Sequence, residues 1–339
     1  MKYRFMSDQP ADLETALVLS GGGAKGAYQA GVIRKFLKMG IRFELVVGSS
    51  IGAVNGVLLA EFIQTGMDIR EICCRFEEIW LSLDGFLSLD WLGFLRNVFT
   101  PINIPSIYDI NVVRRILSLY IPRNRYFSDY TKCQLSVTGT NLSKRKLTIF
   151  DFNSTVPVID AVIASMSYPV AFPAVEIAGD FYIDGGALSN APLKEAVEWG
   201  VENIYLVFLR PLDVIENGKK GNENREENGY SALEVVGEFF EMASNKLMYG
   251  DLKKAEYINQ LINLLNEYQH RLPVNFVKKL HKLNGIKFGE GKKIINITKV
   301  APHETLEPPG LSGFRNKKAI RKIMKMGEDD ASKVFSLSQ

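Results

Sequence analysis

A serine between glycines is the first residue of this sequence whose setting indicates chemistry. Residues 48–52 read G-S-S-I-G, the form G-x-S-x-G, with Ser50 at the centre. The apolar run 45–47 before it is typical of a buried strand, and apolar residues at helical spacing follow it. A tight strand-to-helix turn of this kind presents the serine hydroxyl outward as a nucleophile. Gly48 and Gly52 leave room for the turn, so we predict that Ser50 is a nucleophile.

A glycine loop is the second candidate element of a site. Residues 20–26 read S-G-G-G-A-K-G and follow the apolar run 16–19. Backbone N–H groups of successive glycines can approach a substrate closely and stabilise a developing oxyanion. Loops after neighbouring parallel strands meet at one edge of a sheet, where this loop can face Ser50. The predicted oxyanion hole is Gly21, Gly22 and Gly23, and the loop continues with Lys25 and Gly26 as supporting residues.

The same loop also fits a dinucleotide-binding pattern, G-x-G-x-x-G. That pattern needs an acidic residue about 20 positions on, at the end of the next strand. Glu44 opens that predicted strand, and residues 48–50 occupy its end. No Lys-Ser or Lys-Thr pair follows the glycines, which excludes a Walker phosphate loop. We therefore expect no nucleotide cofactor.

Asp184 is the candidate base. It follows a predicted strand over 181–183 and precedes Gly185 and Gly186, which allow close backbone approach. A turn aspartate that bonds its own backbone is the alternative, and Asp180 in the turn pair 179–180 fits that role better. The ordinary aspartate pKa of ~3.9 makes a weak base, and burial beside Ser50 would raise that pKa.

Histidine, the usual base for such a serine, is absent before residue 270. The order Ser50, Asp184, His303 matches the chain order of an α/β-hydrolase triad, which stays an alternative. His303 follows Ala-Pro in a predicted loop, whereas His270 and His281 lie in basic, helix-like sequence.

The elements that must position these residues alternate between strand and helix. Strand 16–19, helix 28–37, strand 43–47 and a helix after Ser50 predict a parallel sheet covered on both faces. The later predicted strands are 134–140, 146–150, 175–177, 181–183, 204–209 and 294–297, and the later predicted helices are 158–165, 193–199, 232–281 and 319–335.

Residues 69–99 are rich in large apolar side chains, and two interpretations of this segment are open. We favour helices that cover the sheet, and the alternative is a lid or a membrane-facing, acyl-binding surface. A basic stripe formed by Arg315, Lys318, Lys322 and Lys325 is either a solvated face or a face for anionic lipid headgroups.

The composition of the chain limits its class of protein, its partners and its compartment. The chain has 339 residues, a net charge of +3 and 46% hydrophobic residues, which predicts an ample core and no nucleic-acid partner. The three cysteines show no disulfide pattern, and neither a signal peptide nor an apolar run of ~18 residues is found. These features predict a cytoplasmic protein. The predicted division is a core over 12–210, a helical insertion over 211–293 with a mobile loop at 216–229, and a strand and helix over 294–336 that complete the core.

Taken together, the motifs resemble those of the patatin-like phospholipase family. Residues 20–27 resemble its G-G-G-x-[KR]-G loop, 48–53 its nucleophile elbow, and 183–186 its D-G-[AG] motif. Residues 164–173 resemble its A-S-x-x-x-P…F-P segment. The resemblance covers about 16–208 well and 294–331 loosely.

The resemblance implies a three-layer α/β/α sandwich and a Ser–Asp dyad that needs neither metal nor cofactor. Ser50 would carry the acyl group, and Asp184 would activate first Ser50 and then water. The expected activity is hydrolysis of acyl esters of phospholipids or other lipids, with peripheral membrane contact. A non-catalytic lipid-binding protein on the same fold remains the second alternative.

Overall fold

A single eight-stranded sheet forms the centre of the computed structural model, with strand order β5-β6-β3-β2-β1-β7-β8 and β4 paired to β3. The structure describes residues 13–83, 110–169, 171–217, 232–268, 271, 273, 294–307 and 316–336. The strands are β1 (Thr15–Leu19), β2 (Leu45–Gly48), β3 (Gln134–Asn141), β4 (Lys146–Phe150), β5 (Val175–Ile177), β6 (Asp180–Asp184), β7 (Asn203–Val207) and β8 (Asn296–Val300).

The central part of the sheet is parallel. Strand β1 pairs with β2 and β7, β2 pairs with β3, and β7 pairs with β8, all in parallel. Strands β4 and β6 pair antiparallel with β3, and β5 pairs antiparallel with β6. The predicted mainly parallel sheet is therefore confirmed, and a hairpin carrying Asp184 extends it at one side.

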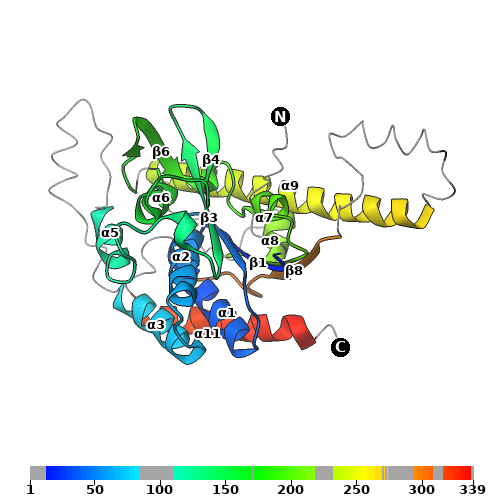
Figure 1. Ribbon diagram of the computed structural model, residues 1–339, viewed down its shortest axis with the longest axis horizontal. Helices are drawn as coiled ribbons and strands as arrows, with labels where there is room; N and C mark the ends of the chain where they lie inside the picture. Colours follow the sequence, from blue (N-terminus) through cyan, green and yellow to red (C-terminus); the bar gives the residue numbers. More distant parts are fainter. Residues whose placement is uncertain are drawn as a thin grey trace.

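Helices cover both faces of this sheet, as Figure 1 shows. The described helices are α1 (Gly26–Lys38), α2 (Ile51–Gln64), α3 (Ile69–Ser82), α5 (Asn111–Leu117), α6 (Val158–Ser165), α7 (Leu193–Glu198), α8 (Leu212–Asn217), α9 (Ala232–Tyr268) and α11 (Lys317–Ser336), with short 3-10 helices η1 (Gly23–Lys25), η2 (Phe127–Asp129) and η3 (Gly185–Ala187). Helices α1, α2, α3, α6 and α11 contribute to one hydrophobic cluster, and α7, α8 and α9 contribute to the other. The result is the predicted three-layer α/β/α sandwich.

Strand β1 explains why the two clusters lie on opposite faces. Leu17 and Leu19 belong to one cluster, while Ala16 and Val18 belong to the other, and all four side chains are fully buried. Alternate side chains of a strand point to opposite faces, so a strand covered on both sides is apolar throughout. The continuous run at 16–19 therefore reflects the central position of β1.

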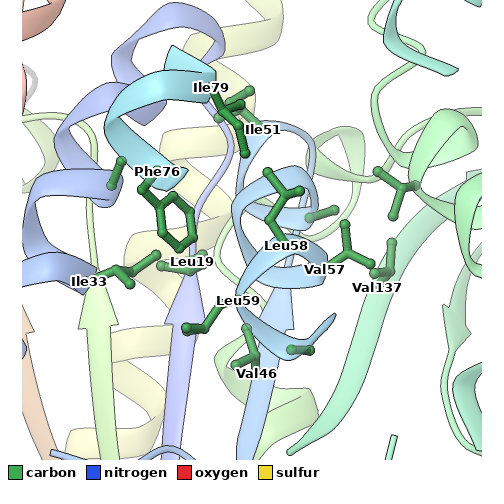
Figure 2. Packing of buried hydrophobic residues seen from close by; sticks show 14 of the residues in the cluster. Leu19, Ile33, Val46, Ile51, Val57, Leu58, Leu59, Phe76, Ile79 and Val137 are labelled. Atoms are coloured by element: carbon green, nitrogen blue, oxygen red, sulfur yellow. The ribbon is translucent and has the colours of Figure 1, made fainter. Parts of the chain in front are cut away.

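Helix α2 fixes the start of the nucleophile turn against the sheet. In Figure 2, Val57 of α2 lies toward Val137 of β3, and Leu59 lies toward Val46 of β2. Phe76 of α3 packs beside Leu19 of β1 in the same cluster. Buried apolar side chains of this size each contribute about 1.5–3 kcal/mol relative to exposure, so this packing holds α2 firmly in place.

The crossing of α1 and α11 is unusually close. A Cβ atom on Gly31 of α1 would overlap the backbone carbonyl of Met324 in α11, and one on Gly327 would overlap the carbonyl of Tyr28. Only glycine fits at both positions. The C-terminal helix therefore lies directly against the helix that follows the glycine loop.

The structure settles part of the prediction for 69–99. Helix α3 covers the sheet, with Phe76 0% and Trp80 1% exposed, so the packing interpretation is confirmed for this part. The remainder, which includes Phe86, Trp91, Phe94 and Phe99, lies outside the described residues.

The predicted helices over 232–281 are described up to Tyr268 as the one helix α9. It supplies Met248 and Leu252 to the second cluster, so it forms part of a layer of the sandwich. Residues 216 and 217 of the predicted loop belong to α8, and residues 218–231 lie outside the described residues. The boundaries 211–293 remain a prediction. Among the described helices, none has the length and apolar character that a bilayer span requires.

Candidate active site

Ser50 lies on the turn between β2 and α2, at the N-cap of α2. Its φ of 55° and ψ of −125° belong to a region that side chains rarely occupy. Its backbone N–H donates to Ser165 Oγ at 2.9 Å, which ties the turn to α6. A Cβ atom on Gly52 would overlap the Leu19 carbonyl, and one on Gly48 would overlap the Gly52 backbone. Both flanking glycines are thus required by close backbone contacts, as the pattern predicts.

Ser50 and Asp184 are in direct contact. Ser50 Oγ donates to Asp184 Oδ2 at 2.6 Å, although the two residues are 134 positions apart. Asp184 is 1% exposed, and its other oxygen, Oδ1, accepts the Gly186 N–H at 2.7 Å. A carboxylate held by a backbone N–H on one oxygen presents the other oxygen to the serine in a fixed orientation.

Burial gives this carboxyl group an unusual acidity. Desolvation raises the pKa of Asp184 to about 7, against the hydrogen bonds from Ser50 and Gly186, which lower it. A proton acceptor works best when its pKa lies near the working pH. The buried Asp184 is therefore a much stronger base than an aspartate in water.

The backbone around Asp184 is anchored on both sides. Its N–H donates to the Ser167 carbonyl at 2.9 Å, and its own carbonyl accepts the Thr140 hydroxyl at 2.9 Å. A Cβ atom on Gly185 would overlap the Thr138 carbonyl of β3. The predicted need for close backbone approach at Gly185 is met by this contact.

The glycine loop lies against the same serine. A Cβ atom on Gly21 would lie 3.0 Å from the Ser50 Cβ. The Gly21 N–H, however, donates to the Asn190 carbonyl at 3.0 Å, so it is not available to an oxyanion. This corrects the part of the predicted oxyanion hole that used Gly21. Gly22 and Gly23 are the N-cap and first residue of η1, and the first N–H groups of a helix have no acceptor within it.

Helix α2 adds a second source of positive potential. It begins at Ile51, so its N-terminus lies directly at Ser50. The N-terminus of a helix carries a partial positive charge of about half an elementary charge. Together with the N–H groups of Gly22 and Gly23, this end of α2 can stabilise negative charge that develops near Ser50 Oγ.

A buried polar network holds the glycine loop in place. Asn55 of α2 donates from Nδ2 to the Gly26 carbonyl at 2.9 Å and accepts from Trp80 Nε1 at 3.0 Å. Gln29 donates from Nε2 to the Ser20 carbonyl at 2.7 Å. These contacts connect both ends of the loop to α1, α2 and α3.

Lys25 of the loop is buried and faces α9. Its Nζ lies 3.7 Å from Glu241 Oε2, and the Lys25 side chain is 6% exposed. Gly26 lies beside the first residue of α2, since a Cβ atom there would be 2.5 Å from Ile51 Cγ1. The glycine loop, the Ser50 turn and the Asp184 motif thus form one site.

His303, the histidine within the described residues, does not lie in this site. His303 Nδ1 lies 2.8 Å from Asp330 Oδ1 and 3.0 Å from Oδ2, so it pairs with a different carboxylate. A triad would need an imidazole between Ser50 and Asp184, which instead touch each other directly. His270 and His281 lie outside the described residues. Within the described residues, no three His, Cys, Asp or Glu side chains are grouped so that they could hold a metal ion.

Several residues of the site have no signal in the sequence. Ser165 supports the Ser50 N–H, Ser167 supports the Asp184 N–H, and Asn190 contacts the glycine loop. Ser165 and Ser167 lie in the segment 164–173 that resembles the family pattern, but that pattern gives no partner for either. Gln29 and Asn55 look like ordinary polar residues on helices.

This fold and site define a serine hydrolase built on a mainly parallel α/β/α sandwich. The profile described as patatin-like phospholipase matches residues 17–197, which is more than half of the chain. The chain belongs to the patatin-like phospholipase family. Membership of this family supports a lipid acyl hydrolase, a serine-type enzyme that acts on lipid esters.

Two relatives illustrate how far the similarity extends. The uncharacterized protein YqhO of Bacillus subtilis is 28% identical over 66% of this chain and 78% of its own length. Lysophospholipase nte1 of Aspergillus terreus is 26% identical over 58% of this chain. The match covers only 12% of that fungal protein.

Among solved structures, VipD from Legionella pneumophila aligns with 97% of this chain and 67% of its own, at 16% identity and a TM-score of 0.45. Because this TM-score is below 0.5, the assignment to the family rests on the sequence profile.

Proposed function

We propose that this chain is a lipid acyl hydrolase of the phospholipase A or lysophospholipase type, acting through a dyad of Ser50 and Asp184. The observation that carries the proposal is the 2.6 Å hydrogen bond from Ser50 Oγ to a carboxylate that is 1% exposed. A nucleophile and a base in hydrogen-bond contact are the minimum that acyl transfer requires.

In the first half of the reaction, Ser50 Oγ attacks the ester carbonyl and its proton moves to Asp184 Oδ2. The carbonyl oxygen becomes an oxyanion, which the N–H groups of Gly22 and Gly23 and the N-terminus of α2 stabilise. The tetrahedral intermediate collapses, and Asp184 returns the proton to the departing alkoxide. The products are an alcohol and an acyl group bonded to Ser50.

In the second half, water replaces the alcohol. Asp184 takes a proton from the water, which attacks the acyl carbonyl, and the same oxyanion donors act again. Collapse of this intermediate releases the fatty acid, and the proton on Asp184 returns to Ser50 Oγ. One carboxyl group therefore serves both halves because its raised pKa suits both the uptake and the release of a proton.

The substrate class follows from the family and from relatives whose names record lysophospholipase activity. We infer carboxylic esters of glycerolipids, with phospholipids and monoacyl phospholipids as the first candidates. The head group, the acyl length and the position of the cleaved ester are set by the shape of the pocket.

A fluorophosphonate probe tests the nucleophile. Such a probe phosphonylates an activated serine, so wild-type protein should be labelled and Ser50→Ala should not. Folded wild-type protein that resists labelling would contradict the proposal and would favour a lipid-binding protein without catalytic activity.

Hydrolysis of a substrate panel tests the reaction and its base. Short p-nitrophenyl esters, lysophosphatidylcholine and phosphatidylcholine vesicles should all be cleaved more slowly by Asp184→Asn, and Asp180→Asn is the matched control. Full activity in Asp184→Asn together with loss in His303→Ala would support the triad instead.

A further inference from the structure

Helix α9 has an inner face that contacts the motifs of the candidate active site. Ser244 Oγ donates to the Gly186 carbonyl at 2.8 Å, and Tyr168 Oη donates to the Gly237 carbonyl at 3.2 Å. Glu241 adds the ion pair with Lys25 described above. This half of α9 is therefore attached to both the glycine loop and the Asp184 motif.

The outer face of the same helix is exposed and mostly apolar. Phe239 is 71% exposed, Met242 68% and Tyr257 68%. These residues belong to one line of side chains, spaced by three, four or seven positions, which place them on one side of a helix. We call this line the outer stripe; it consists of Val235, Phe239, Met242, Lys246, Lys253, Tyr257 and Leu264.

The outer stripe points away from the protein body. The buried side chains of the helix, such as Ser244, Met248 and Leu252, fall on its opposite side. In Figure 1, α9 crosses the upper part of the molecule, away from α1, α3 and α11. An apolar line of this length on a soluble surface usually marks a contact with another molecule or a membrane.

The composition of the outer stripe selects a lipid surface as the partner. It joins aromatic and aliphatic side chains with two lysines, which is the pattern of helices that lie in a bilayer interface. The charge of Lys246 complements anionic headgroups, whereas the charge of Lys253 is balanced by Glu256, whose Oε2 lies 3.0 Å from Lys253 Nζ. A bilayer on this stripe would lie about one helix diameter, ~10 Å, from the contacts at Gly186 and Lys25.

We propose that the outer stripe of α9 docks the protein on an anionic lipid surface and so brings its candidate active site to the bilayer. The proposal rests on the proposed function, since it supplies the way in which a lipid hydrolase reaches its substrate.

The basic stripe predicted on α11 is a weaker candidate for this role. Lys322 and Lys325 both pair with carboxylates, Glu304 and Asp329, at 3.5 and 2.8 Å, whereas the pairing in the outer stripe involves Lys253 with Glu256. Arg315 lies outside the described residues. Figure 1 places α11 on the other side of the sheet from α9.

Vesicle binding tests the proposal with a control of equal exposure. Phe239 and Leu119 are both 71% exposed, but Leu119 follows α5 and lies outside the stripe. Phe239→Asp combined with Met242→Asp should weaken co-sedimentation with phosphatidylcholine–phosphatidylglycerol vesicles about tenfold or more, because two apolar anchors are lost. Leu119→Asp should bind like wild type, and Lys246→Glu should weaken binding only when phosphatidylglycerol is present.

Hydrolysis of a soluble p-nitrophenyl ester separates docking from catalysis. The double variant should keep its rate on this ester and lose rate on vesicles. Docking through the stripe would be overturned if the double variant lost rate equally on both substrates or bound vesicles like wild type. It would also be overturned if the wild-type protein bound vesicles neither with nor without phosphatidylglycerol. In the last case, Ser50-dependent hydrolysis of the soluble ester would leave the proposed function intact.

A second copy of the chain is the rival occupant of the outer stripe. Light scattering after size-exclusion chromatography measures this directly. A wild-type dimer that Phe239→Asp converts to a monomer, with vesicle binding unaffected, would assign the stripe to self-association and reject the lipid proposal.

Discussion

The two ends of strand β6 each carry an aspartate next to a glycine, Gly179–Asp180 and Asp184–Gly185, yet their surroundings differ completely. Asp180 forms an ion pair with Lys144 and accepts a hydrogen bond from Asn141 Nδ2 at 3.1 Å, and these contacts lower its pKa. Asp184 has no cation beside it in the described structure, and desolvation raises its pKa to about 7.

This difference shows that position in a strand does not decide what a carboxyl group can do. Asp180 gains partners that favour its charged form, so it stays ionised and cannot hold a proton near neutral pH. Burial removes water from Asp184 and leaves only neutral hydrogen-bond donors beside it. Its carboxylate form is therefore disfavoured and accepts a proton more readily. Four residues along one strand separate a structural anion from a candidate catalytic base.

Replacement of each carboxylate in turn should give the largest difference in activity between the two ends of β6. Asp184→Asn should lower kcat/KM for a soluble ester by roughly 10²–10⁴-fold, because a general base contributes about that much. Asp180→Asn should change it less than twofold, since Asp180 contacts Lys144 and Asn141. Steady-state kinetics on the two variants measures both effects, and comparable losses would show that Asp184 acts through the fold.

The pH dependence of the rate should follow the pKa of Asp184 alone. Below pH 7 the carboxyl group is mostly protonated and cannot accept the Ser50 proton. The value of kcat/KM should therefore fall about tenfold for each pH unit below 7 and reach a plateau above it. The Asp180→Asn variant should give the same profile. A rate that stays flat from pH 5 to pH 8 would contradict a raised pKa for the base.

Gly179 and Gly185, which adjoin the two aspartates, should differ in how much free energy of unfolding is lost when a methyl group is added. Gly185→Ala should destabilise the fold by about 1–3 kcal/mol, because its Cβ would overlap the Thr138 carbonyl. Gly179 has open space around it and a φ of +81°, so Gly179→Ala should cost about 1 kcal/mol of backbone strain. Denaturant unfolding measures both, and the order of the two values is the test.

The two aspartate variants should also change thermal stability in opposite directions at pH 8. The folded-state pKa of Asp184 lies above its unfolded value, so wild-type stability falls as pH rises from about 4 to 7. Asp184→Asn should thus raise Tm more at pH 8 than at pH 4, although loss of the serine hydrogen bond offsets part of the gain. Asp180 has a lowered pKa, so Asp180→Asn should lower Tm at pH 8. Thermal unfolding at both pH values tests the two signs.

Local patterns made much of this site predictable. The turn at Ser50, the hairpin before Asp184 and the apolar run of β1 depend on neighbours in sequence, and each appears where its pattern indicates. The correction at Gly21 has a different origin. Its N–H is taken by Asn190, a residue brought close by the fold, and no local pattern encodes that partner.

Helix α9 shows the same limit on a larger scale. Its apolar spacing predicts a helix, but the spacing does not say which face packs on the sheet. The inner face is selected by Met248 and Leu252, which fill the second cluster, and by Ser244, which meets the Gly186 carbonyl. Which face of α9 is buried depends on three-dimensional packing, and a single sequence does not show that packing.

The tight crossing of α1 and α11 has a consequence for how the protein is made. Tyr28 Oη donates to Asp330 Oδ2 at 3.2 Å across 302 positions of the chain. During synthesis on a ribosome, Tyr28 emerges 302 residues before Asp330, so the face of α1 that contacts α11 stays uncovered until α11 has been made.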